Sequence, residues 1–221
     1  MASSASSLST PTPAAPATGQ ASWAGESPLR GAARQRLIEA AGRCIVRDGL
    51  TATSLSSVAG EAAVSRPTVY RYFADRHALI LATVLDASRA LVSDLDDHLR
   101  GFDDPREMAV EAMLFVVRAI PRRPLLQSMW SSTALDAEML ADFTRSEVRA
   151  LAREALARLA AAAGWSDADA DAAVEWMLRV LLSLLIAPAP ERDDAALRAL
   201  LERRLVPALP FRPKASRKRS A

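Results

Sequence analysis

Residues 64–73 read VSRPTVYRYF, and they have the features of a short helix with a well-defined start. Ser65 suits the N-cap position, and Pro67 falls in the first turn, where its missing N–H costs nothing. Val64 and Val69 stand at the two positions whose apolar side chains pack together across a helix start. Because the same stretch holds two arginines and two tyrosines, we expect this helix to meet an anionic partner.

The two sides of this helix are expected to differ in character. Val69 and Phe73 lie four residues apart and should face the core. The outward or flanking positions suit a nucleic acid, since arginine can bind guanine, proline can touch a thymine methyl group, and hydroxyl groups can bind phosphate oxygens. These positions are Arg66, Pro67, Thr68, Tyr70, Arg71 and Tyr72. A solvated basic surface without a partner is the alternative.

Two helices are predicted before this one and a longer helix after it. Apolar residues at helical spacing indicate a first helix over about 31–48, which Gly49 ends. Thr53 or Ser54 then caps a second helix, and Asp75 caps the helix that follows the quoted stretch. The second and third helices, with the short turn between them, form a helix-turn-helix, whose later helix enters the DNA major groove.

The charge of the chain is distributed unevenly over its 221 residues, although the net charge is only +2. Residues 30–80 carry eight arginines against four acidic residues, and residues 208–221 carry five basic residues and no acidic one. The remainder of the chain is therefore net acidic, at −7. A basic block on an acidic body indicates an anionic partner for one part of the chain only.

Composition and cysteine content exclude several classes of protein. A content of 50% hydrophobic and 24% charged residues is typical of a soluble globular protein. Cys44 is the single cysteine, so no internal disulfide can form. Residues 1–20 lack the pattern of a secretory signal, and Glu175 and Arg179 interrupt the most apolar segment, 174–190. We therefore expect a cytoplasmic protein with no membrane partner.

The pattern along the whole chain predicts an all-α fold with about nine helices. Beyond the first four helices, helical periodicity and Pro or Gly boundaries indicate helices at about 105–120, 122–131, 136–163, 167–187 and 191–206. Both ends are expected to be disordered, because their composition buries too little apolar surface to offset the ordering entropy. We predict a tail at 1–29, a helix-turn-helix domain at 30–80, a larger helical domain at 81–207 and a basic tail at 208–221.

The stretch LTATSLSSVAGEAAVSRPTVYRYFADRHAL, residues 50–79, closely resembles the amino-terminal DNA-binding domain of TetR-family transcriptional regulators. The resemblance covers about residues 32–85 and implies a homodimer whose divergent helical body binds a small ligand. It predicts a sequence-specific DNA-binding regulator, a repressor that binds a palindromic operator and that a small hydrophobic ligand releases. The alternative is an all-helical protein–protein interaction module without sequence-specific DNA binding.

The resemblance also implies roles for individual residues of the reading head. Arg66, Pro67 and Arg71 match the base-reading positions of the family, whereas Thr68 and Tyr70 match positions that touch bases or phosphates. Thr53, Ser65, Tyr72 and Arg76 match positions that contact the DNA backbone. Arg76 replaces the usual lysine and keeps its charge. Ala63 stands where the family usually has the glycine of its turn, and alanine in a left-handed conformation is strained.

The larger domain offers candidates for a ligand pocket and for a dimer interface. Large apolar residues at helical spacing are pocket candidates, with an ordinary core as the alternative: Met108, Ala112, Phe115, Val116, Met129, Trp130, Met139 and Phe143. The last two helices carry a broader apolar face than an exposed helix should, so they are expected to form a four-helix bundle with a second subunit. The interface candidates are Val174, Met177, Leu178, Leu181, Leu182, Leu185, Leu197 and Leu201, with burial inside the chain as the alternative.

No pattern of an enzyme or of a metal site stands out. His77 and His98 lie far apart without other ligand residues around them, and no Ser/His/Asp set, glycine-rich phosphate loop or pair of carboxylates is evident. We therefore expect no catalytic residue, no metal and no cofactor. The partners that the sequence implies are double-stranded operator DNA, a second copy of this chain and a small molecule.

Overall fold

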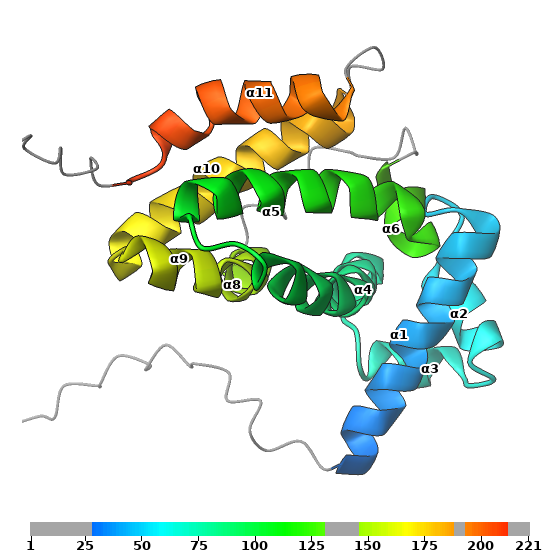
Figure 1. The fold of residues 1–221 in the computed structure, drawn as a ribbon. Helices are drawn as coiled ribbons and strands as arrows, with labels where there is room; N and C mark the ends of the chain where they lie inside the picture. Colours follow the sequence, from blue (N-terminus) through cyan, green and yellow to red (C-terminus); the bar gives the residue numbers. More distant parts are fainter. Residues whose placement is uncertain (1–27, 131–145, 188–192, 212–221) are drawn as a thin grey trace, which may run out of the picture.

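The computed structural model describes residues 28–130, 146–187 and 193–211, and this part of the chain is entirely helical (Figure 1). It holds ten α-helices and two short 3-10 helices, and no strand. The predicted all-α class is therefore confirmed. One helix more than the expected nine is present because the region predicted as a single helix at 136–163 breaks, within its described part, at Leu156, which has φ −102° and ψ 9°.

Three short or medium helices and the start of a fourth form the amino-terminal unit. They are α1 (Pro28–Asp48), α2 (Leu55–Glu61), α3 (Arg66–Tyr70) and α4 (Arg76–Leu99). Their common core holds Leu37, Val58, Val69, Phe73 and Leu79 among its buried residues. α1 begins at Pro28, inside the tail predicted at 1–29 and about one turn before the start that periodicity indicated.

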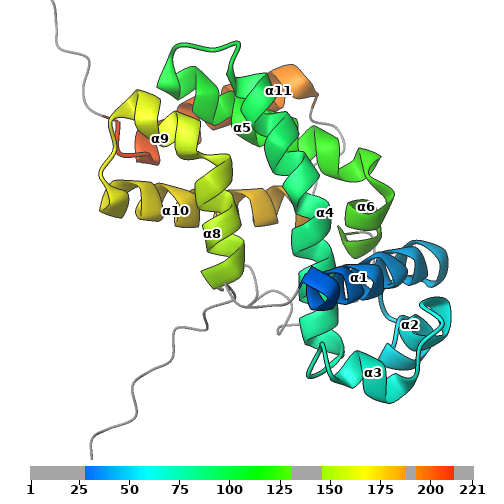
Figure 2. The same cartoon turned by 90° about the horizontal axis from the view of Figure 1, so that it is seen from below.

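The body of the molecule is built by the later helices, which pack around α5 (Figure 1). They are α5 (Pro105–Ala119), a 3-10 turn (Ile120–Arg122), α6 (Pro124–Trp130), α8 (Ser146–Ala155), α9 (Ala157–Ala163), α10 (Asp167–Ile186), α11 (Asp194–Arg204) and a last 3-10 turn (Val206–Ala208). α8 packs along α4 on the lower side of the body (Figure 2). Side chains from α4, α5, α10 and α11 share the main core of this body.

α4 joins the two parts without interruption (Figure 2). Leu79, near its start, lies in the amino-terminal core, whereas Leu95 and Leu99 lie in the core of the body. The domain boundary predicted between residues 80 and 81 therefore falls inside a helix. α4 is therefore shared by the amino-terminal unit and the body.

α6 makes a second connection between the two parts. Leu125 packs against a small buried cluster of Ile45, Leu50 and Ile80 in the amino-terminal unit. The next residue, Leu126, is buried in a cluster of the body with Leu91. Two neighbouring side chains of one short helix thus lie in different cores.

The carboxy-terminal end of the described chain is packed on the body. Leu209 is buried, and the Trp165 Nε1–H donates a hydrogen bond to the Pro210 carbonyl oxygen at 3.1 Å. The centre of the Phe211 ring lies 5.2 Å from the centre of the Trp165 ring and 4.9 Å from the Arg106 guanidinium carbon. The predicted start of the disordered tail at residue 208 is therefore wrong for residues 208–211. The Phe211 ring packs against Trp165 and Arg106, which lie far away in the sequence, so helical periodicity could not indicate these contacts.

Among the described residues, no helix combines the length and the apolar character that crossing a membrane requires. The same part of the chain holds no cluster of His, Cys, Asp and Glu that could bind a metal ion.

Replacing Ala63 with glycine is expected to stabilise the protein by about 0.5–1 kcal/mol. Ala63 lies in the turn between α2 and α3 with a φ of 53°, the left-handed conformation expected for this position. Glycine adopts this φ without crowding of Cβ, which outweighs its larger loss of backbone entropy on folding. Urea unfolding measures the change. The same substitution at Ala62, where φ is −85°, should destabilise instead, and equal shifts at both positions would show that the turn is unstrained.

Candidate nucleic-acid interface and apolar cavity

α3 is held at its start and along one side in the way that the sequence predicts. The Ser65 hydroxyl accepts a hydrogen bond from the Thr68 N–H at 3.3 Å, so Ser65 is the N-cap residue. Its oxygen also lies 2.8 Å from the Thr68 hydroxyl oxygen. Val69 and Phe73 are buried in the amino-terminal core. α3 is therefore fixed in position while its opposite side faces outward.

The outward side of α3 carries most of the predicted DNA-contacting residues. Arg66, Pro67 and Arg71 are exposed, and Tyr70 is 56% exposed. The Arg71 guanidinium lies 5.3 Å from the centre of the Tyr72 ring, which itself packs partly against the amino-terminal core. Because the Tyr72 ring is held by the core, its attraction for the Arg71 guanidinium restricts the direction of the Arg71 side chain.

Arg34 was not among the predicted site residues, yet the structure places it beside α3. Its guanidinium lies 5.0 Å from the centre of the Phe73 ring, which follows α3 in the chain. The signal was present in the sequence as the arginine-rich start of α1, but the spacing alone did not show which helix this segment approaches.

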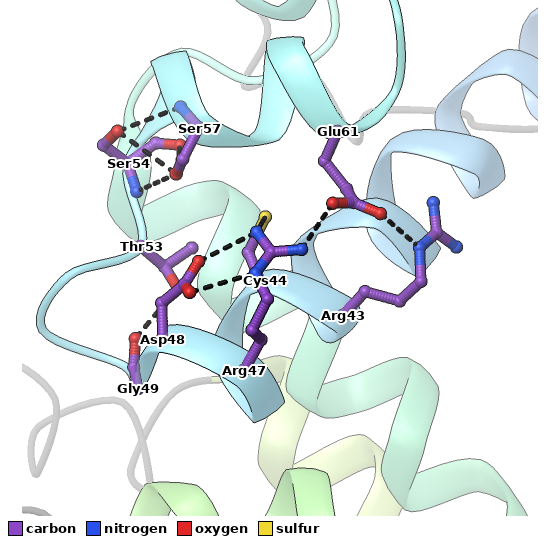
Figure 3. A network of polar contacts seen from close by, with 9 residues as sticks. All are labelled: Arg43, Cys44, Arg47, Asp48, Gly49, Thr53, Ser54, Ser57 and Glu61. Carbon is purple, nitrogen blue, oxygen red and sulfur yellow. Dashed lines mark hydrogen bonds and ion pairs between the residues drawn. The ribbon is translucent and has the colours of Figure 1, made fainter.

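Thr53 is buried and hydrogen-bonded within the loop between α1 and α2. Its residue surface is only 1% exposed, and its hydroxyl donates a hydrogen bond to the Gly49 carbonyl oxygen at 2.9 Å. The N-cap residue of α2 is Ser54, which exchanges hydrogen bonds with Ser57 in a capping box (Figure 3). The Thr53 side chain closes the loop between α1 and α2, and the expected contact of Thr53 with the DNA backbone stays a prediction.

Arg76 also points to the protein rather than away from it. Its Nε–H donates to the Thr53 carbonyl oxygen at 2.6 Å, and one terminal nitrogen donates to the Leu50 carbonyl oxygen. These two carbonyls belong to the loop between α1 and α2, whereas Arg76 is the first residue of α4. In this structure Arg76 forms a bridge that fixes this loop to α4, and its expected phosphate contact stays a prediction.

Two further arginines hold α1 and α2 together (Figure 3). The Glu61 carboxylate accepts hydrogen bonds from Arg43 and Arg47, each at 2.7 Å, and Arg47 also contacts Asp48 at 2.9 Å. The hydrogen bonds from Arg43 and Arg47 hold the pKa of Glu61 below its usual range. Much of the basic excess of residues 30–80 is thus used inside the amino-terminal unit, which leaves Arg66 and Arg71 as the exposed arginines on α3.

An apolar cavity of about 160 Å³ lies inside the body. Side chains from α4, α5, α6, α8 and α10 line it, together with Ile120. Of the predicted pocket residues, Ala112 and Val116 line this cavity. Met108 is buried in the core instead, and the Phe115 ring stacks on His98 at 5.0 Å. Met129 and Trp130 belong to α6, whose last side chains are not described, and Met139 and Phe143 lie outside the described residues.

About half of the cavity wall comes from positions on α4 and α8 that were not among the predicted pocket residues. α4 contributes Val84, Ser88, Leu91, Val92 and Leu95, and α8 contributes residues 148, 151, 152 and 155. Both sets follow the spacing of three and four that marks one helix face, so a search for apolar faces along every predicted helix would have found them. Which of these faces meet around a space depends on how the helices pack.

The predicted dimer-interface residues lie mainly inside the chain. Val174, Met177, Leu197 and Leu201 are buried in the core of the body, and Leu178 and Leu181 line the cavity. Leu185 packs against the cluster that contains Leu91 and Leu126, and Leu182 is half-buried. The alternative of burial within the chain is therefore correct for most of this set, because the broad apolar face of α10 covers α5 and the cavity.

The outer side of α10 carries a different set of residues. Trp176 is 42% exposed and Ile186 is 48% exposed, and the exposed Arg179 and Ser183 lie between them. The steps between these positions alternate between three and four residues, so they share one helix face. Large apolar side chains exposed together on one face are a candidate surface for association.

A buried carboxylate connects three helices behind the cavity. Glu111 of α5 is 5% exposed, lies 3.1 Å from the His98 Nε2 of α4, and accepts a hydrogen bond from Arg198 of α11. Burial raises the pKa of Glu111, but the hydrogen bonds from Arg198 and His98 outweigh burial and leave the pKa below its usual value. This group therefore remains charged and paired within the protein.

Comparison with protein families and curated proteins identifies what the amino-terminal unit is similar to. A family model described as bacterial regulatory proteins of the tetR family matches residues 37–83. An uncharacterised HTH-type transcriptional regulator of Mycobacterium tuberculosis (strain ATCC 25618 / H37Rv) is 29% identical over 188 residues, which are 84% of this chain and 90% of that protein. The nicotine-responsive repressor HdnoR of Paenarthrobacter nicotinovorans is 35% identical over 80 residues, which are 36% of this chain and 41% of that protein.

Solved structures share the whole arrangement of helices. The TetR family repressor AlkX from Dietzia sp. is 20% identical with a TM-score of 0.59, over 83% of this chain and 97% of that chain. RolR in complex with resorcinol is 18% identical with a TM-score of 0.60, over 83% of this chain and 90% of that chain. Similarity at this level of identity establishes the fold, a helix-turn-helix unit joined to a helical body.

Proposed function

We propose that this chain, which belongs to the TetR family of bacterial regulatory proteins and is a DNA-binding transcriptional regulator, is a repressor that a small hydrophobic ligand releases from its operator. The family is one of regulators and not of enzymes. In this proposal residues 30–80 bind DNA, residues 81–207 bind the ligand and a second subunit, and the protein works in the cytoplasm, where its operator is.

The observation that carries this proposal is the exposure of two arginines on a firmly capped α3. Arg66 and Arg71 face outward while Val69 and Phe73 anchor the helix from behind. We assign base reading to Arg66, Pro67 and Arg71, since the guanidinium group binds guanine O6 and N7 in a bidentate pair. Contacts with bases or with the DNA backbone are assigned to Ser65, Thr68, Tyr70 and Tyr72.

A palindromic operator follows if two copies of α3 act together. Half-sites for helix-turn-helix dimers lie about 34–36 Å apart, one turn of DNA. The exposed face of α10 with Trp176 and Ile186 supports association with a second copy, because large apolar side chains gain free energy when a partner covers them. In this dimer α10 of one subunit lies against α10 of the other.

Ligand release requires a difference in packing between the DNA-bound and ligand-bound states. Two helices that line the cavity also hold the amino-terminal unit. Ser88 and Leu91 of α4 face the cavity, and Arg76 at the start of the same helix grips the loop between α1 and α2. On α6, Leu126 lines the cavity while Leu125 packs against Ile45 of α1. A ligand that shifts either helix changes the position of α3.

Names of similar proteins agree with this proposal without establishing it. HdnoR is named a nicotine-responsive repressor, AlkX is described as a repressor implicated in n-alkane biodegradation, and RolR was solved with resorcinol. These descriptions belong to those proteins. They support repression and response to a small molecule as the proposed activity of this chain.

Replacing Arg71 with alanine tests the proposed DNA interface. Selection of bound sequences from a random duplex pool should first enrich an inverted repeat. On that repeat, Arg71→Ala is expected to cost about 1–3 kcal/mol, or about 5–150-fold in affinity, and to relax the preference at one base position per half-site. Fluorescence anisotropy with single-base variants of the repeat measures both effects.

The exposed Arg203 on α11 provides a matched control, and Arg203→Ala should bind the repeat like the unchanged protein. An equal loss on every duplex would assign Arg71 to phosphate rather than to a base. If the pool yields salt-sensitive binding but no enriched sequence, the proposed repressor is wrong, and the interaction-module alternative gains support.

A further inference from the structure

We infer that the effector is an uncharged molecule about the size of one substituted ring, held by apolar contacts and by a single hydrogen bond to Ser88. This inference rests on the proposed function, since it names the ligand class of the cavity in the body. It goes beyond the proposed function in three respects. The volume of the cavity indicates the size of the ligand, the lining residues indicate its charge, and Ser88 indicates its polar group.

The volume of the cavity limits the size of the ligand. At about 160 Å³ it is close to the roughly 150 Å³ of apolar cavities that hold one benzene molecule. One six-membered ring with a short alkyl group, or a short branched chain, fills such a space. A ligand with three fused rings exceeds it unless the surrounding helices move apart.

The part of the cavity lining that the structure describes disfavours a charged ligand. Among the described residues, every lining residue except Ser88 has an apolar side chain, and none is Asp, Glu, Lys, Arg or His. An unpaired carboxylate or ammonium group in such a site loses its hydration without compensation, which costs far more than apolar contacts return.

Charged groups near the cavity are already bound to each other. Glu111, on the same helix as the lining residues Ala112 and Met113, is paired with His98 and Arg198. Arg123 precedes α6 and forms an ion pair with Asp94. These groups point away from the lining or are neutralised, so none of them provides a counter-charge for a ligand.

Ser88 is the one polar side chain among the described residues that line this cavity. It lies in the middle of α4, is half-buried and lines the cavity. Two other hydroxyl groups on helices donate a hydrogen bond to a carbonyl oxygen of their own helix. The Thr83 hydroxyl donates to the Leu79 carbonyl oxygen and the Ser128 hydroxyl to the Pro124 carbonyl oxygen, both at 2.8 Å. No hydrogen bond of the Ser88 hydroxyl is present in the described part of the chain, so this hydroxyl remains available to one hydroxyl or carbonyl group of a ligand.

A matched series of three compounds tests the inference on the full chain without DNA. Isopropylbenzene, 3-isopropylphenol and 3-isopropylbenzoate share one apolar frame and differ in the group on the ring. Titration calorimetry should give similar dissociation constants for the first two and binding at least about 100-fold weaker for the benzoate. Equal or tighter binding of the benzoate would overturn the inference, as would absence of binding by both neutral compounds.

Substitutions then locate the binding site. Ser88→Ala should weaken binding of the phenol by about 3–10-fold and leave isopropylbenzene unchanged. Ala152→Leu fills the cavity from α8 and should weaken both compounds by at least about tenfold. Ala112→Val, a smaller addition, serves the same purpose if the first variant does not fold.

Ala157→Leu, at an exposed position of α9, is the control and should bind both compounds normally. Unchanged binding in both cavity variants would place the site elsewhere and overturn the inference.

Measurements with the enriched operator separate this inference from the proposed function. If the neutral compounds bind and the operator affinity does not change, the ligand class stands and the proposed release mechanism fails. If a charged compound releases the operator while the neutral compounds do not bind, release stands and the inferred ligand class fails.

Discussion

A double variant with Trp176→Glu and Ile186→Glu is expected to be monomeric and to bind the operator about 10²–10⁴-fold more weakly than the unchanged protein. Trp176 and Ile186 are the exposed large apolar side chains on the outer face of α10, and four acidic side chains across a two-fold axis would repel each other. A monomer presents one α3 to one half-site. In a dimer, binding of one α3 holds the other α3 close to its half-site and so raises the affinity for the whole operator. The monomer lacks this gain in affinity.

Sedimentation velocity measures the association state, and fluorescence anisotropy measures binding to the full operator and to an isolated half-site. Val46→Glu is the matched control, because Val46 is similarly exposed at 50% but lies on α1. This control should remain dimeric. A double variant that sediments as a dimer would show that subunits associate through another surface.

Replacing Arg76 with alanine is expected to destabilise the protein by about 2–4 kcal/mol rather than to remove a DNA contact. Its guanidinium makes two charge-assisted hydrogen bonds to the carbonyl oxygens of Leu50 and Thr53, and such bonds contribute about 1.5–3 kcal/mol each before partial exposure is taken into account. Loss of the side chain also leaves the loop between α1 and α2 without its link to α4. Urea unfolding should show a lower midpoint with an unchanged slope.

The substitution Arg76→Lys separates two roles of this side chain, the bridge to the loop between α1 and α2 and a contact with a DNA phosphate. Lysine keeps the positive charge but has no planar fork, so it can replace at most part of the bridge. We expect about half of the stability loss in this variant and an unchanged dependence of operator binding on salt in both variants. A normal unfolding midpoint for Arg76→Ala, together with a salt dependence lowered by about one phosphate contact, would restore the backbone-contact role.

The helix-turn-helix could be predicted from local sequence because its determinants are local. A cap at Ser65, a proline in the first turn, apolar anchors at Val69 and Phe73 and a left-handed turn at Ala63 all act within a few residues, and each has its expected place in the structure. The exposed position of Arg66 and Arg71 follows from the same periodicity, since fixing two positions of a short helix fixes the direction of the others.

The roles of Thr53 and Arg76 could not be predicted in the same way. The Arg76 guanidinium bonds carbonyl groups that lie 23 and 26 residues earlier in the chain, and no local pattern reports such a distance. A resemblance of motifs transfers a residue type and a position. It does not transfer the direction of a long flexible side chain, which depends on the acceptors that the folded chain places within reach.

The sequence by itself determined that the described part of this chain is all-helical, that residues 50–79 form a helix-turn-helix and that the body is apolar enough for a core. Helix periodicity and capping are properties of neighbouring residues, so they can be read along the chain. Only the tertiary structure decided which apolar faces cover each other. The inner face of α10 closes a cavity with α4, α5, α6 and α8, which leaves Trp176 and Ile186 outside, because a helix face becomes core, cavity wall or surface according to the helices that pack against it.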